Sequence, residues 1–77
     1  MGNTEDLHIG KMIRQTLRKQ GRSVTWLAKE LNCCRTNMYL IFQKSHLDTA
    51  LLLRISHIMG YNFFADVAKI IESNDRL

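Results

Sequence analysis

The chain has 77 residues, of which 45% are hydrophobic and 23% are charged, and its formal net charge is +4. No apolar run approaches the roughly 20 residues of a membrane-spanning helix, and the polar N-terminus lacks the apolar core of an export signal. These totals exclude a membrane protein and predict one cytoplasmic domain over residues 1–77, with a core over about 7–72 and frayed termini.

The first predicted helix runs from about Leu7 to Gln20. Apolar side chains recur there at four-residue intervals and share one helical face: Ile9, Ile13 and Leu17. We expect Asp6 or Thr4 to cap its start and Gly21 to end it. The chain contains no proline and no run of alternating β-branched residues, so an all-α fold is favoured.

Two short amphipathic segments follow, over about 24–31 and 35–43, and Ser23 is a good N-cap for the first of them. Their apolar faces are marked by Leu27, Ala28 and Leu31 and by Met38, Ile41 and Phe42. The intervening Asn32-Cys33-Cys34 is long enough only for a turn. A helix, a tight turn and a second helix are the parts of a helix-turn-helix unit.

Two further helices complete the prediction. Asp48 is expected to cap a helix that Gly60 ends, and Asn62 to cap a last helix from Phe63 to about Glu72. Their apolar faces consist of Leu51, Leu52, Ile55, Ile58 and Met59, and of Phe63, Phe64, Val67, Ile70 and Ile71. The sequence therefore predicts a compact bundle of about five short helices.

Positive charge is concentrated in the middle of the chain. Residues 9–54 contain nine Lys or Arg and two acidic residues, so this segment carries +7, while both flanks contain acidic residues. A basic block around a helix-turn-helix pattern is expected of a protein that binds a polyanion. The alternative is that these side chains only solvate helix faces.

The pattern from Ile9-Gly10 through Leu27-Ala28 and Asn32-Cys33-Cys34 to Met38 and Ile41 resembles the phage-repressor-like (XRE-type) helix-turn-helix family. The resemblance covers about residues 7–60. It implies a lambda-repressor-like bundle, sequence-specific binding of double-stranded DNA, a third helix in the major groove, and a homodimer. Val24 stands where the family often has a Gln that reaches a phosphate, so a neighbouring hydroxyl has to take over.

The outward face of the third helix carries the predicted base contacts. At about 100° per residue, Met38, Ile41 and Phe42 point inward, and a mixture of polar and apolar side chains points outward. Arginine pairs with guanine, Asn and Gln pair with adenine, and leucine contacts a thymine methyl group. The predicted base contacts are Arg35, Thr36, Asn37, Tyr39, Leu40 and Gln43.

Contacts to phosphates and to a second subunit are predicted elsewhere. The predicted phosphate contacts are Arg14, Arg18, Ser23, Thr25 and Lys44. For the two arginines, a solvated basic face is the equal alternative. Leu53 falls outside the apolar face of its helix, and together with Phe63 and Phe64 it predicts a dimer surface. Trp26 is interpreted as a partly exposed packing residue, or as an indole that contacts a phosphate.

Other functions have little support in the sequence. Cys33 and Cys34 are adjacent and the three histidines are scattered, so we predict no metal site and no cofactor. No catalytic pattern or small-molecule site is recognisable, and we predict that the chain is not an enzyme. Because Tyr39 and Leu40 give the third helix an apolar character, a protein-interaction module of the same fold, such as an antitoxin, is the alternative function.

Overall fold

The computed structural model describes residues 8–75, and the side chains of residues 8–70. This part of the chain forms five α-helices and no strand: α1 (Ile9–Lys19), α2 (Val24–Glu30), α3 (Arg35–Gln43), α4 (Thr49–Met59) and α5 (Phe63–Asp75). The prediction of an all-helical fold with about five short helices is confirmed. None of these helices has the length and apolarity needed to cross a membrane.

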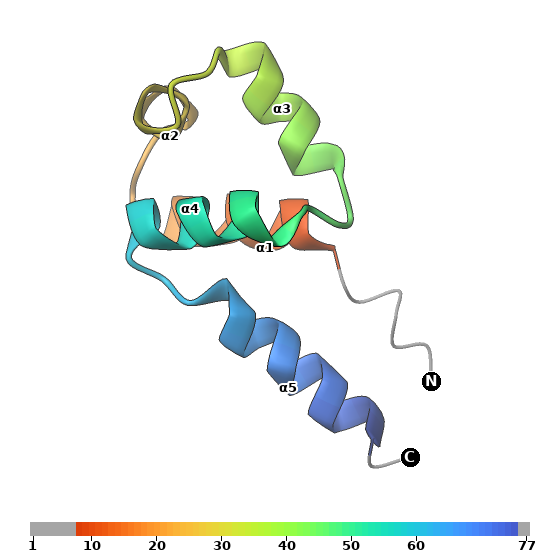
Figure 1. The fold of residues 1–77 in the computed structure, drawn as a ribbon. Helices are drawn as coiled ribbons and strands as arrows, with labels where there is room; N and C mark the ends of the chain where they lie inside the picture. Colours follow the sequence, from red (N-terminus) through yellow and green to blue (C-terminus); the bar gives the residue numbers. More distant parts are fainter. Residues whose placement is uncertain (1–7, 76–77) are drawn as a thin grey trace.

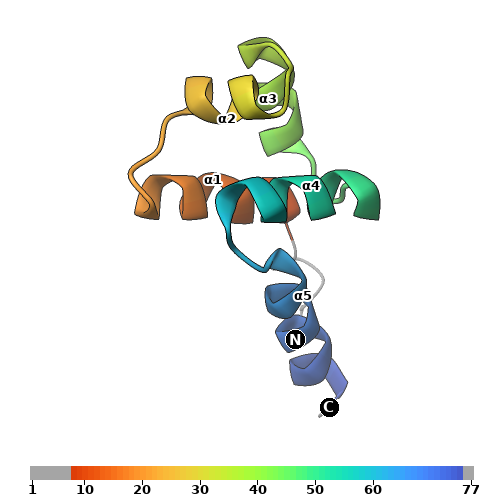
Figure 2. The ribbon, with the colours of Figure 1, turned by 60° about the vertical axis from the view of Figure 1, so that its left-hand side comes forward.

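The helices are arranged in levels (Figures 1 and 2). Helices α1 and α4 lie at one level, α2 and α3 lie on one side of it, and α5 extends away on the other side. Helix α3 packs most closely against α1 and α2. The core contains the apolar side chains that face inward from all five helices: Ile9, Ile13, Leu17, Leu27, Ala28, Leu31, Met38, Ile41, Phe42, Leu52, Ile55, Met59 and Phe63.

Side chains cap four of the helices, three of them as predicted. The side-chain oxygens of Ser23, Asp48 and Asn62 accept hydrogen bonds from the backbone N–H groups of Trp26 (3.0 Å), Leu51 (2.8 Å) and Ala65 (3.2 Å). The predicted cap of α1 is wrong. His8 is the N-cap, because its backbone is extended and its Nδ1 accepts from the N–H of Lys11 at 3.1 Å. Asp6 and Thr4 lie outside the described residues.

The predicted helix stops are also confirmed. Gly21 follows α1 with φ 70°, and Gly60 ends α4 with φ 63°. Asn32, in the turn between α2 and α3, has φ 58°. Asparagine enters this left-handed region more readily than most residues, so the chain reverses here without a glycine. Cys34 caps α3 without a hydrogen bond from its side chain.

Backbone contacts connect the start of α1 to the end of α3. The N–H groups of Ile9 and Gly10 donate to the carbonyl oxygens of Ser45 (3.0 Å) and Lys44 (2.9 Å). A Cβ atom at Gly10 would clash with the carbonyl oxygen of Phe42 and would lie 2.7 Å from that of Ile41. Gly10 is therefore required by close approach of two backbones, and this contact orients α3 relative to α1.

Helix α5 is attached mainly at its first turn. Phe63 is fully buried, and the ring of Tyr61 packs on it with the centroids 4.7 Å apart. The Tyr61 hydroxyl donates to Oδ2 of Asp66 at 2.6 Å, which raises the pKa of Tyr61 because the hydrogen bond favours the protonated phenol. The prediction that Phe63 belongs to a dimer surface is wrong, because its ring is buried in the core.

Candidate nucleic-acid interface

The outward face of α3 is the most regular array of candidate contact residues. The inward positions Met38, Ile41 and Phe42 are buried. Their burial fixes the rotation of α3 about its axis, so that the predicted base contacts point away from the core. All of them are exposed: Arg35, Thr36, Asn37, Tyr39, Leu40 and Gln43. Leu40 has half of its surface exposed, 51%, so an apolar side chain is available on this face.

A basic face of α1 lies next to α3. Lys11, Arg14 and Arg18 are exposed, and with Gln15 they line a shallow hollow of about 260 Å³. Their spacing of three, four and seven residues places them on one side of the helix. Lys11 and Gln15 were not among the predicted contacts, although the same spacing that singled out Arg14 and Arg18 also includes them.

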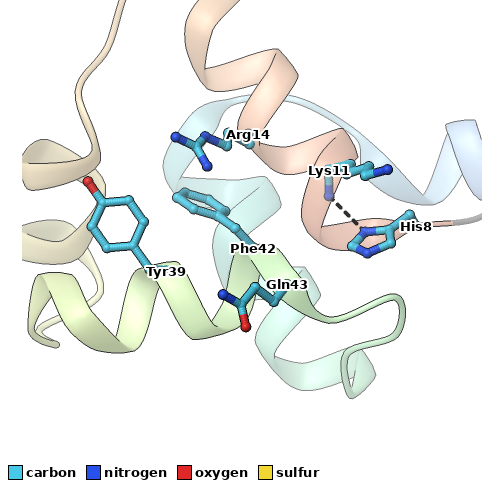
Figure 3. A pocket seen from close by; sticks show the side chains of 6 residues that line it. All are labelled: His8, Lys11, Arg14, Tyr39, Phe42 and Gln43. Atoms are coloured by element: carbon cyan, nitrogen blue, oxygen red, sulfur yellow. Dashed lines mark hydrogen bonds between the residues drawn. The ribbon is translucent and has the colours of Figure 1, made fainter.

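A second hollow, of about 350 Å³, joins these two faces (Figure 3). Side chains from α1 and α3 and the residue that caps α1 line it: His8, Lys11, Arg14, Tyr39, Phe42 and Gln43. The guanidinium carbon of Arg14 lies 5.8 Å from the centroid of the Tyr39 ring and 5.5 Å from that of Phe42. The fold therefore brings Arg14, a predicted phosphate contact, into the same hollow as Tyr39 and Gln43, which are predicted base contacts. None of the described residues that line either hollow is acidic.

The remaining predicted phosphate contacts are exposed but line neither hollow. Ser23 and Thr25 lie at the start of α2, and Lys44 follows α3. The Ser23 oxygen accepts the cap hydrogen bond, so its hydroxyl hydrogen remains free to donate to another group. Nearby, the guanidinium of Arg22 stacks over the half-buried ring of Trp26 at 4.2 Å. This contact fits the interpretation of Trp26 as a packing residue. Arg22, an exposed cation beside α2, was not among the predicted contacts.

The predicted dimer surface is divided by the fold. Leu53 is 51% exposed and lines a depression of about 450 Å³ with Glu30, Arg54, His57 and Ile58. Phe64 is 36% exposed and lines a different hollow, of about 250 Å³, between α5 and the start of α4. The two exposed apolar residues therefore belong to separate surfaces.

No metal centre is present among the residues that the structure describes: no group of three or more His, Cys, Asp or Glu side chains converges there. Cys33 is half-buried, Cys34 is exposed, and both are free thiols.

Comparisons with protein-family models, with curated proteins and with solved structures find no match to this chain. The functional argument therefore depends on the residues and their arrangement.

Proposed function

We propose that this protein is a sequence-specific DNA-binding transcriptional regulator of the XRE type, with a lambda-repressor-like fold, that inserts α3 into the major groove. The observation that carries the proposal is the exposed face of α3 beside a basic hollow that no described acidic side chain lines. A face with base-pairing side chains next to cations that meet phosphates is the arrangement that DNA recognition requires.

The α2–α3 pair supports the proposal as a helix-turn-helix unit. The two helices pack against each other, and the short connection between them turns at Asn32, where φ is 58°. In this unit the first helix lies across the DNA backbone and the second enters the groove. Ser23 and Thr25 at the start of α2 are then close enough to the backbone for their hydroxyl groups to donate to phosphate.

The chemistry of the α3 face suits a mixed readout. Arg35 pairs with guanine, Asn37 and Gln43 pair with adenine, and Leu40 contacts a thymine methyl group. Thr36 donates to a base edge or to an adjoining phosphate. An exposed leucine gains favourable apolar contact in such an interface, whereas on a solvated face it contributes nothing.

A second copy of the chain is the partner proposed for the Leu53 depression. Glu30 and Arg54 line it together with the apolar Leu53 and Ile58. In a two-fold dimer the same patch meets itself, so opposite charges within one patch are able to pair across the axis. Phe64 remains outside this contact, because it lines another hollow.

Selection of bound sequences from a random DNA pool, followed by titration at two salt concentrations, tests the proposal. We expect enrichment of a defined motif with two half-sites about 10 base pairs apart, or a multiple of this, and affinity that falls steeply with salt. Substituting Arg35 and Thr36 by Ala should weaken binding to the selected site by about tenfold or more, since a good base contact contributes about 1–3 kcal/mol.

Lys69→Ala is the matched control, because Lys69 is an exposed cation on α5 that lies far along the chain from the α3 face. It should leave the affinity unchanged. An unenriched pool, or binding that is insensitive to salt, contradicts DNA recognition. Co-purification of a stoichiometric protein partner that survives the Arg35/Thr36 substitution favours the protein-interaction module.

The dimer is tested separately by Leu53→Asp, with Ala65→Asp at an exposed position of α5 as the control. A buried carboxylate at the two-fold axis should shift the protein to a monomer in sedimentation equilibrium and weaken binding to the paired half-sites. A Leu53→Asp protein that remains dimeric contradicts this assignment of the interface.

A further inference from the structure

Arg14 packs against the two aromatic rings of α3, and what we infer from this packing rests on the proposed function. Tyr39 and Phe42 pack edge-to-face, with centroids 6.2 Å apart and an interplanar angle of 78°. The Arg14 guanidinium lies within 6 Å of both centroids. Figure 3 shows it reaching from α1 toward these rings. A long side chain on one helix is thereby held against another helix.

This packing differs from that of an ordinary surface arginine. A guanidinium that stacks on aromatic faces keeps its in-plane N–H groups free for hydrogen bonds. Of the two rings, Phe42 is buried and Tyr39 is exposed to solvent. Because this contact restricts the Arg14 side chain before any ligand arrives, the side chain loses less conformational entropy when it binds one.

The rest of the hollow supplies further donors and no described acid. Lys11 contributes an ammonium group and Gln43 an amide group. His8 also lines the hollow, and its Nδ1 accepts from the N–H of Lys11. In a neutral ring with this hydrogen bond, Nε2 carries the proton and is a donor. Side chains with donor groups from the start of α1, from its second turn and from the end of α3 thus line one hollow.

We infer that this hollow is the seat of one DNA backbone phosphate, bound by Arg14 and Lys11 with His8 at its edge, and that Tyr39 is a positioning residue for Arg14. Tyr39 thereby acts through Arg14 and not through a base, which changes its predicted role. A phosphate bound there connects α1 to the DNA that α3 reads, and so fixes the register of α3 in the groove.

Four variants measured against the selected DNA site over a range of salt concentrations test this inference. Arg14→Ala should lower the affinity and reduce the slope of log K against log salt by about 0.9, the value for one phosphate contact. Tyr39→Phe keeps the ring and should bind like the wild type. Tyr39→Leu keeps apolar bulk but has no π face, and should lose on the order of threefold to fivefold in affinity.

The decisive variant combines Tyr39→Leu with Arg14→Ala. If Tyr39 acts through Arg14, the leucine should cause no further loss in the Arg14→Ala background, and the selected base sequence should not change. An equal loss in both backgrounds, a loss with Tyr39→Phe, or an unchanged salt slope for Arg14→Ala overturns the phosphate seat while DNA binding itself stands. A wild-type protein that binds no DNA overturns the proposed function and the seat together. Urea unfolding of each variant verifies that the fold is retained.

Discussion

Different kinds of contact join α1 to α3 at one junction and α4 to α5 at another. At the first, backbone meets backbone: two N–H groups of α1 donate to carbonyl groups that follow α3, and Gly10 has no Cβ to hold them apart. At the second, side chains hold the helix: Phe63 is buried, and Tyr61 packs on it and bonds to Asp66.

This difference has a consequence for function. A backbone contact tolerates little adjustment, so the α3 face and the basic face of α1 form one rigid unit. Side chains hold α5: Phe63 is buried, and Val67, one turn later, is half-buried and packs against the core. Such contacts allow α5 to separate from the bundle while the rest stays folded. Beyond Val67, Ala68 and Lys69 are exposed and Ile70 is half-buried. Substitutions at the two junctions should therefore have separable effects on stability and on DNA binding.

Gly10→Ala should have the largest effect. The added methyl group meets carbonyl groups of α3, which cannot move as a flexible side chain would, so we expect a loss of about 3 kcal/mol or more in the free energy of unfolding. For a chain of this size that is a large part of the total, roughly 4–11 kcal/mol. Urea unfolding measures the loss, and the selected DNA should also be bound more weakly because α3 is displaced.

Gly21→Ala is the control for this prediction. Its φ of 70° is unfavourable for alanine, but no other atom lies within 4 Å of the added Cβ. The expected loss is about 1 kcal/mol, from backbone strain alone. Equal losses for the two glycines would mean that the close approach at Gly10 is relieved by small shifts.

Phe63→Ala should have the next largest effect on stability and a small one on DNA binding. A buried phenylalanine contributes about 3 kcal/mol or more, but the loss is limited here because α5 can detach. Calorimetry should show α5 unfolding before the remainder, and the variant should still bind the selected site. Phe64→Ala removes a ring of the same size that is 36% exposed and should lose about 1 kcal/mol or less.

The local features of the fold could be predicted from the sequence. Ser23, Asp48 and Asn62 act as caps because a short side chain need only reach an N–H group three residues ahead. Gly21 and Gly60 end helices for an equally local reason. Such contacts depend on neighbours in the sequence, so the pattern of residue types determines them.

The long-range features could not be predicted in this way. The contact of Gly10 with α3 and that of Arg14 with Tyr39 depend on how helices cross, which periodicity does not specify. Phe63 and Phe64 are adjacent, and the pattern alone does not decide which ring enters the core. The exposure of the α3 face was predictable because it follows from the buried positions on the same helix.

The smallest expected effect is a change in the free energy of unfolding at alkaline pH, caused by Tyr61 at the attachment of α5. The pKa of Tyr61 is raised in the folded protein by its hydrogen bond to Asp66, by burial and by the charge of that carboxylate. The unfolded phenol ionises near about pH 10, so the stabilising contribution is complete below that pH and is lost as pH rises through the folded pKa. Tyr61→Phe should therefore be less stable than the wild type at pH 7, by about 1 kcal/mol or less for a half-buried hydrogen bond.

The difference in stability between Tyr61→Phe and the wild type should shrink above about pH 10, because the wild type then loses the contact that the variant never had. Tyr39→Phe, which leaves the bond between Tyr61 and Asp66 intact, should show no such convergence. If Tyr61→Phe and the wild type are equally stable from pH 7 to pH 11 in urea unfolding, the hydroxyl contributes nothing to the attachment of α5, and apolar packing holds this junction.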